Sequence, residues 1–303
     1  MTELSDVTSA EIAAELVRAR TRAGSPVMGM VLTLVVVTDE DGAEAAMDAA
    51  RAASREHPAR LLGVVLGDGR GRGHVDAHVR TGTGGSGEVA LIRLRGEVVR
   101  HASSVVLPLL LPDAPVAVWW PADAPADPAA DPLGALGQRR ITDAAAATRR
   151  RTTVLRTQCG AYSPGDTDLA WTRLTRWRAL LAASLDLHPG RVRSARVGAE
   201  AHSPSADLLA AWLELRLKIT VERVTTSGPG ITETSLTLAD GEVRITRPGG
   251  GLATLSSPGR PDQSVALPRR ELPDLLGEEL RRLDEDEVYA ALARRVGSRR
   301  RRT

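Results

Sequence analysis

The sequence predicts an α/β protein: an N-terminal α/β domain that contains a βαβ unit in a mixed sheet, followed by a second, α+β domain with an antiparallel meander. Two observations predict this fold class. An apolar run at residues 28–37, a helical pattern at 43–56 and a second apolar run at 60–66 succeed one another with short joints, which is typical of a parallel βαβ unit. Short alternating segments separated by glycines fill residues 218–267, and this pattern favours antiparallel strands.

Length and composition agree with two medium-sized domains. The chain has 303 residues, of which 42% are hydrophobic, so it can bury a sizeable core. Aromatic residues make up only 2%, so Leu, Val and Ala must fill that core. We expect an N-terminal domain at residues 1–163 and a C-terminal domain at 164–303, with the boundary at the turn near Ser163. The basic C-terminus, from about 297 to 303, is predicted to be a disordered tail.

Charge and cysteine content narrow the classes of function. The 40 basic and 38 acidic residues leave a net charge of +2, which argues against nucleic acid as a partner. The single cysteine, Cys159, excludes a disulfide within the chain and fits a reducing cytosol. The N-terminus is acidic and amphipathic, unlike a signal peptide, and no apolar run reaches the ~18 residues of a membrane span. We therefore expect a cytoplasmic protein with no membrane partner.

The first half of the chain is predicted to continue with helices and strands around the βαβ unit. A helix is expected at residues 9–23, with Ser9 as its cap. Polar and apolar residues alternate at 74–80, which indicates a half-exposed strand, and a glycine turn leads to a partner strand at 88–94. The next helix is expected at about 97–110.

Two adjacent tryptophans end the short buried strand that comes next. Trp119 and Trp120 must face opposite ways, so we expect one of them near a surface or a cleft. A loop rich in Pro, Ala and Asp follows, then Arg139 and Arg140, and then a helix that is predicted to begin at Ala144.

A stretch rich in tryptophan and arginine holds a helix that is expected to begin near Asp168, whose side chain can accept from the unpaired N–H groups of the first turn. On a helical wheel Trp171 lies on the apolar face, and Arg178 falls on the same side. Arg173 and Arg176 point to water. The stretch is either a capped core helix, with Trp filling volume, or a contact surface, because Trp and Arg are enriched at binding hot spots.

The rest of the chain is predicted to build the second domain. A strand is expected at 191–199 and a helix at 205–217, ahead of the meander at 218–267. Two helices that run from acidic to basic residues, at 271–283 and 286–296, close the chain.

The motifs that could bind a cofactor, a phosphate or a metal are better interpreted as turns and as an exposed strand face. Residues 82–87 spell GxGxxG, but a strand follows them where a dinucleotide site needs a helix, so we interpret them as a hairpin turn. Residues 67–73 lack the Lys-Ser/Thr of a phosphate loop. His74, Asp76 and His78 share the wet face of a strand, where polar residues are expected without a metal. The sequence therefore predicts no cofactor, no metal and no catalytic constellation.

Five segments in order resemble one known family. They are 111–121 (LPDAPVAVWWP), 131–143 with its RRITD end, 165–178 (GDTDLAWTRLTRWR), 203–207 (SPSAD) and 278–289 (EELRRLDEDEVY). Together they resemble the OpcA family of glucose-6-phosphate dehydrogenase assembly proteins, in the right order over nearly the whole chain.

The resemblance implies a function. It implies a non-catalytic protein that binds glucose-6-phosphate dehydrogenase and supports its assembly or activity, and thereby the supply of NADPH in the oxidative pentose-phosphate pathway. It also implies a chain of two parts, an N-terminal α/β domain and a C-terminal domain. No catalytic residues of the family are carried over to this sequence.

The segments that resemble the family supply the candidate residues for a partner or anion site. They are expected at a strand end, a rim loop and a helix N-terminus, which is where an α/β sheet usually forms its crevice. These candidates are Trp119, Trp120, Arg139, Arg140, Asp166, Asp168, Trp171 and Arg178. Two other classes of function remain open. One is an enzyme that acts on a sugar phosphate or nucleotide in a cleft where Arg139, Arg140 and Arg178 bind the anion. The other is a nucleic-acid-binding module that uses residues 149–151 and the tail.

Overall fold

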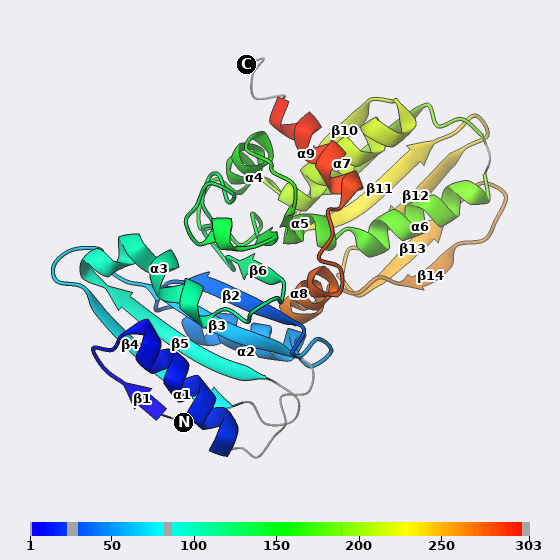
Figure 1. Cartoon of the computed structure of the whole chain (residues 1–303). Helices are drawn as coiled ribbons and strands as arrows, with labels where there is room; N and C mark the ends of the chain where they lie inside the picture. Colours follow the sequence, from blue (N-terminus) through cyan, green and yellow to red (C-terminus); the bar gives the residue numbers. More distant parts are fainter. Residues whose placement is uncertain (1, 23–29, 82–86, 189, 299–303) are drawn as a thin grey trace. The chain divides into compact units, whose positions relative to one another are not determined.

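The computed structural model describes residues 2–22, 30–81, 87–188 and 190–298 (Figure 1). By their internal contacts these residues form two compact units that interleave along the sequence. Unit 1 comprises Met1–Asp143, Ser163–Thr167 and Leu272–Asp286, and unit 2 comprises Ala144–Tyr162, Asp168–Glu271 and Glu287–Thr303. The chain passes five times from one unit to the other. A boundary between independently folding domains at 163/164 stays a prediction.

Unit 1 is built on an eight-stranded sheet. Its elements are β1 (Thr2–Leu4), α1 (Ser9–Arg22), β2 (Leu32–Thr38), α2 (Ala43–Ala53), β3 (Ala59–Leu66), β4 (His74–Thr81), β5 (Glu88–Arg95), η1 (Gly96–His101), α3 (Ala102–Val106), η2 (Leu107–Leu109), β6 (Val116–Trp119), η3 (Gly134–Leu136), β7 (Arg139–Thr142), β8 (Asp166–Asp168, whose last residue belongs to unit 2) and α8 (Leu272–Arg281).

The sheet order is β1-β4-β5-β3-β2-β6-β7-β8. β2 pairs in parallel with β3 through the α2 crossover, so the predicted βαβ unit is confirmed. β3 and β5, β2 and β6, and β6 and β7 are also parallel, whereas β4 is antiparallel to both β1 and β5. The sheet is therefore mixed, as predicted. Its central strands are buried on both faces, because parallel strands need cover on each side.

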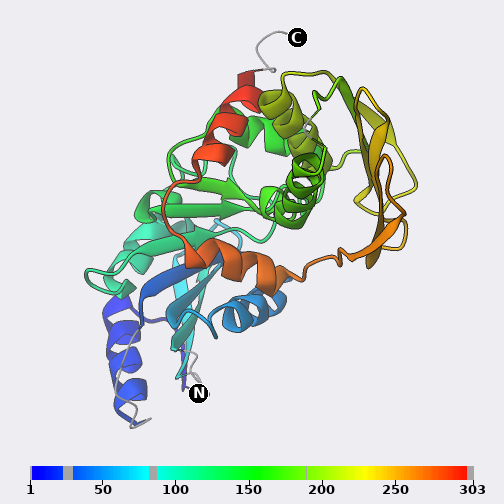
Figure 2. The same cartoon turned by 90° about the vertical axis from the view of Figure 1, so that its right-hand side faces the viewer.

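Helices cover both faces of this sheet. α1 and the segment from η1 to η2 pack their apolar residues on one face, and α2 with α8 covers the other (Figure 1, Figure 2). α2 approaches β3 closely at Gly63, where an added Cβ would lie 2.6 Å from the Met47 sulfur. Glycine at that position therefore sets the distance between helix and sheet.

Three predictions about the helices in the first half of the chain were wrong. The helix expected at 97–110 is instead two 3₁₀ turns and a short helix, since Pro108 and four valines disfavour one continuous helix. The helix expected from Ala144 begins at Arg151, and the Ala144 N–H donates instead to the Asp168 carboxylate at 2.9 Å. The cap of α1 is Thr8, whose N–H and hydroxyl both bond Glu11 at 2.8 Å in a capping box.

Unit 2 has its own sheet of six strands. Its elements are α4 (Arg151–Gly160), α5 (Leu169–Thr172), α6 (Thr175–Asp186), β9 (Ser194–Ala199), α7 (Pro204–Leu217), β10 (Val221–Thr225), β11 (Ile231–Thr237), β12 (Glu242–Thr246), β13 (Leu252–Ser256), β14 (Gln263–Ala266) and α9 (Glu287–Ser298).

The sheet order in unit 2 is β10-β9-β11-β12-β13-β14. β11 to β14 pair antiparallel, which confirms the meander. β10 differs from the expectation: it is parallel to β9, because α7 lies between the two strands and carries the chain back to the same end.

One face of this sheet is covered by helices and the other is open (Figure 2). Burial alternates along β12 and β13, and exposed ion pairs lie across the open face, Arg196 with Glu222 and Arg244 with Glu242. The second unit is thus a two-layer α+β unit, as predicted. Residues 82–86 of the GxGxxG motif and 299–303 of the basic tail lie outside the described residues. No helix in the described part of the chain is long and apolar enough to span a membrane.

Candidate functional site

The two adjacent arginines of β7 face opposite ways and both are buried. Arg140 donates to the Asp166 carboxylate, to the Gly137 carbonyl at 2.8 Å and to the Pro164 carbonyl. Asp166 also accepts from the Ser163 N–H at 2.8 Å. Burial raises the pKa of Asp166, and the hydrogen bonds from Ser163 and Arg140 oppose that shift. Arg140 thus fixes the 163–166 turn against β7.

Arg139 makes a second buried ion pair, with a residue far along the chain. Its Nη2 donates to Glu279 of α8, and its Nη1 donates to the Asp284 carbonyl at 3.0 Å. The Nε of Arg139 is buried with no acceptor among the described residues. The guanidinium therefore holds α8 in unit 1.

The tryptophan pair at the end of β6 is buried on both sides of the sheet. Trp119 is fully buried and Trp120 is 4% exposed, so the expectation that one of them lies near a surface was wrong. Trp120 packs in the same core as α1, because the apolar face of that helix needs large partners. A direct contact of these two side chains, or of Arg139 and Arg140, with a partner would require their exposure. Their role in a partner or anion site stays a prediction.

The other three candidates lie together in unit 2. Asp168 caps α5, as expected: its Oδ1 accepts from the Ala170 N–H at 2.8 Å. Trp171 is 1% exposed, and the Arg178 guanidinium stacks on its ring at 3.7 Å from the centroid. The ring of Tyr289 lies 6.2 Å away. The expected single helix is divided into α5 and α6, but the division leaves Trp171 and Arg178 in contact.

The single cysteine lies in the core of unit 2. Burial raises the pKa of the Cys159 thiol to about 12, and the charge of Asp168 adds to this shift. The thiol is therefore protonated at neutral pH and is a poor nucleophile.

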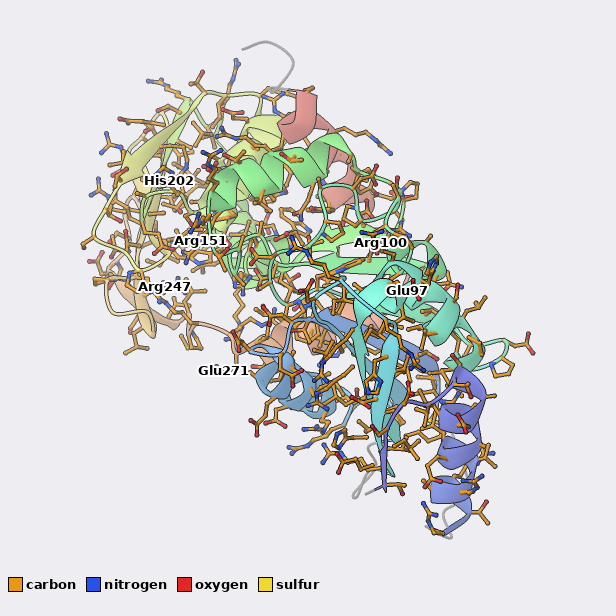
Figure 3. The ribbon with its side chains drawn as sticks, turned by 90° about the vertical axis from the view of Figure 1, so that its left-hand side faces the viewer. Glu97, Arg100, Arg151, His202, Arg247 and Glu271 are labelled. Atoms are coloured by element: carbon orange, nitrogen blue, oxygen red, sulfur yellow. The ribbon has the colours of Figure 1, made fainter. Side chains whose placement is uncertain are left out.

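A cavity that the sequence did not predict opens in unit 2. We call it the arginine cavity; its volume is about 230 Å³. Six arginines and one glutamate line it. These charged residues are Arg151, Arg173, Arg176, Arg247, Arg269, Arg270 and Glu200. Figure 3 shows Arg151 and Arg247, which come from α4 and from the loop after β12.

Three helices begin at the arginine cavity. α4 begins at Arg151, α6 at Thr175 and α7 at Pro204, and residues of each first turn line the cavity. The N-cap residues of these helices, Arg150, Leu174 and Ser203, make no capping hydrogen bond with their side chains. Because the helix dipole concentrates positive potential at such ends, their convergence adds to the field of the arginines.

Arg247 is the innermost arginine of the cavity wall. It is only 7% exposed, its Nη1 donates to the Leu267 carbonyl at 3.0 Å and its Nη2 to the Ile231 carbonyl at 3.1 Å. Its guanidinium lies 5.0 Å from the ring centroid of Trp177. Burial lowers the pKa of Arg247 to about 10, and the neighbouring charge of Arg269 contributes to this shift, yet the side chain stays charged at pH 7.

A second cavity in unit 2 provides a contrast. Its volume is about 420 Å³, and the charged residues that line it are of both signs. Arg156 and Arg223 each pair with Asp207 at 3.3 Å. This cavity therefore has no comparable excess of positive charge. Within the part of the chain that the structure describes, no group of three or more His, Cys, Asp or Glu could hold a metal ion.

The arginine cavity could not be found from local sequence signals. Its arginines are spread from residue 151 to residue 270 in a chain where 39 of the 40 basic residues are arginine, so no cluster stands out. On the helical wheel Arg173 and Arg176 pointed to water and carried no further signal. The sheet and the helix starts bring them together with Arg247.

The fold and these sites define a two-unit α/β protein with buried ion pairs in one unit and a cationic cavity in the other. Residues 50–159 match the N-terminal domain, and residues 164–293 the C-terminal domain, of a family described as glucose-6-phosphate dehydrogenase subunit. The chain therefore belongs to the OpcA family of glucose-6-phosphate dehydrogenase assembly proteins.

Two of the solved structures that are similar to this chain are distant likenesses. An oxidoreductase from Sinorhizobium meliloti is 10% identical, with a TM-score of 0.48 over 89% of this chain and 96% of that chain. A structure described as trehalose-6-phosphate from E. coli bound with UDP-2-fluoro glucose is 12% identical, with a TM-score of 0.26 over 65% of each chain. At these values neither supports an argument about function. No curated protein matches the chain.

Proposed function

We propose that the chain is a non-catalytic assembly factor or allosteric activator that binds glucose-6-phosphate dehydrogenase and supports NADPH production in the oxidative pentose-phosphate pathway. One observation carries the proposal: both parts of the chain, in order, match domains of a protein described as a glucose-6-phosphate dehydrogenase subunit.

The buried arginines of unit 1 favour this proposal over an enzyme that binds a sugar phosphate through them. Arg139 and Arg140 are engaged by Glu279 and Asp166, and both are almost wholly buried. A substrate could reach them only by displacing two buried ion pairs, which would cost several kcal/mol. Their geometry fits a structural role.

The first prediction concerns the effect on the dehydrogenase. The purified chain alone should turn over no glucose 6-phosphate with NADP, whereas its addition should raise the rate of the cognate dehydrogenase to a plateau. Steady-state kinetics on the native enzyme measures the allosteric effect, and recovery of active oligomer after dilution from denaturant measures assembly. Co-elution of the two proteins in size-exclusion chromatography should accompany the rise. Unchanged kcat, KM and refolding yield at saturation would exclude the proposal.

The second prediction places part of the dehydrogenase contact at Arg178. The side chain is half-buried on the ring of Trp171, and its Nη2 donates to the Thr175 hydroxyl at 3.2 Å, so its position is held before a partner binds. Arg178→Ala should weaken binding by about 2 kcal/mol or more, as at a hot spot. The melting temperature should fall little, because a cation–π contact near the surface contributes only about 0.5–1 kcal/mol.

A binding titration and a thermal melt on each variant test this prediction. Arg196→Ala is the control, since Arg196 is an exposed arginine of unit 2 that lies outside the arginine cavity. It should bind the dehydrogenase like the wild type. If Arg178→Ala also binds and activates like the wild type, α6 is not part of the contact.

A further inference from the structure

We infer that the arginine cavity of unit 2 binds a small phosphorylated metabolite, with the phosphate held between the arginines and the three helix N-termini. This inference does not rest on the proposed function, because it concerns a ligand of the chain alone. All the residues that line the cavity belong to unit 2.

Most of the positive charge in the cavity is not balanced by carboxylates. Four of the six lining arginines pair with no carboxylate in the described part of the chain: Arg151, Arg176, Arg247 and Arg269. In contrast, Arg223 elsewhere in unit 2 forms an ion pair with Asp207. Like charges held together in a concave wall raise the local potential and attract an anion. Glu200 offsets only part of this charge.

The wall of the cavity holds Arg247 in a fixed position. Arg247 is held by two backbone carbonyls and by the Trp177 ring, so its charge is fixed in place with little freedom to lose on binding. Its Nε is buried without an acceptor in the described chain. Burying a guanidinium without a carboxylate costs free energy of folding, and a bound anion would offset that cost.

Three helix N-termini converge at the cavity. α4, α6 and α7 have 10, 12 and 14 residues, so each carries a full helix dipole. The N-cap side chains of these helices make no capping hydrogen bond, so the positive ends of the helix dipoles lie beside the guanidinium groups, and this combination suits phosphate oxygens. A carboxylate has fewer oxygens to engage such a set of donors.

The size and polarity of the cavity restrict its occupant. The volume of about 230 Å³ is below the ~300–1,000 Å³ of pockets for drug-sized ligands. Beside the charged residues the lining is mixed: Leu174, Trp177 and Ile231 are apolar, whereas Ser203 and Ser205 carry hydroxyl groups. An occupant with a compact uncharged part next to its phosphate therefore fits, such as a sugar phosphate.

Calorimetry and thermal shift on the full chain alone test the inference, with glucose 6-phosphate, ribose 5-phosphate and glycerol 3-phosphate as probes. At least one of them should bind saturably at or below millimolar concentration and raise the melting temperature. Inorganic phosphate should bind more weakly and glucose not at all. Rising salt should weaken binding, because ions screen the cationic wall.

Substitutions at the rim identify the site without disturbing the core. Arg176→Gln and Arg269→Gln remove exposed side chains and should each weaken sugar-phosphate binding about tenfold or more, as the loss of a charge-assisted contact does. Glu200→Gln should tighten it, since one repelling carboxylate is lost. Arg196→Gln is the matched control: this arginine is exposed on the open face of the same sheet and should have no effect.

Three results would overturn the inference. They are no saturable binding by any of the sugar phosphates, equal binding of glucose, or sugar-phosphate binding that Arg176→Gln and Arg269→Gln leave unchanged. If these two variants instead lose the dehydrogenase while the wild type binds no phosphate, the cavity receives a protein carboxylate and not a metabolite. Failure of dehydrogenase activation alone leaves the binding data unaffected, so the two proposals fail separately.

Discussion

Glu279→Ala is expected to lower the free energy of unfolding by about 3–5 kcal/mol, because it leaves the buried charge of Arg139 without its carboxylate. Arg139 is 3% exposed and Glu279 7%, so water cannot replace the lost partner without opening the unit. Of the acceptors that the structure gives Arg139, only the Asp284 carbonyl would remain. Urea denaturation followed by circular dichroism measures the change.

An exposed ion pair on the same helix provides the control. Arg281 of α8 donates to Glu56 at 2.6 Å, but both side chains are more than half exposed, so Arg281→Ala should leave the urea midpoint nearly unchanged.

The double variant Arg139→Met with Glu279→Leu shows whether the unpaired buried charge or the lost packing causes the destabilisation. Apolar side chains of similar volume remove the charge and its partner together, so the double variant should be considerably more stable than Glu279→Ala. If the double variant is as unstable as Glu279→Ala, lost packing and not the unpaired charge explains the effect.

The βαβ unit could be predicted from the sequence because its signal is local. A strand buried on both faces is apolar along most of its length, and residues 32–38 and 59–66 are two mostly apolar runs with a helix between them. The meander of β11 to β14 could also be predicted from the sequence. A sheet with one covered and one open face makes apolar and polar residues alternate, as they do along β12 and β13. Both predictions depended on residues close together in the chain.

The position of α8 depended on partners far along the chain. The sequence shows an amphipathic helix ending in basic residues, which would suit either unit. Only the contacts with α2 and the Arg139–Glu279 pair, 140 residues apart, assign it to unit 1. No periodicity carries that information.

The candidate site shows the same limit. Tryptophans and arginines in family-like segments were chosen because such residues are enriched at hot spots, but seven of the eight chosen residues are buried. Arginine used as an internal clamp has the same sequence signature as arginine on a binding surface. The arginine cavity, in contrast, is built from residues that looked solvent-facing or isolated, so only the fold could assemble it.

Trp171→Ala is expected to lower the free energy of unfolding by about 3–5 kcal/mol through the cavity that it leaves. The indole is 1% exposed and lies in the core of unit 2 beside Tyr289 and under Arg178. Because the side chains around a deleted group in a close-packed core relax only partially, most of the gap should remain. Trp171→Phe keeps most of the ring and should lose less.

The effect of Trp171→Ala on the dehydrogenase decides between the two interpretations of this helix. If Trp171 only packs the core, binding measured at low temperature, where the variant is still folded, should match the wild type. If Trp171 also positions Arg178, binding should weaken to the level of Arg178→Ala, and the Trp171→Ala/Arg178→Ala double variant should bind no worse than either single one. We expect the second result, because the stacked ring is the surface on which the guanidinium rests. Additive losses in the double variant would show that the two side chains act independently.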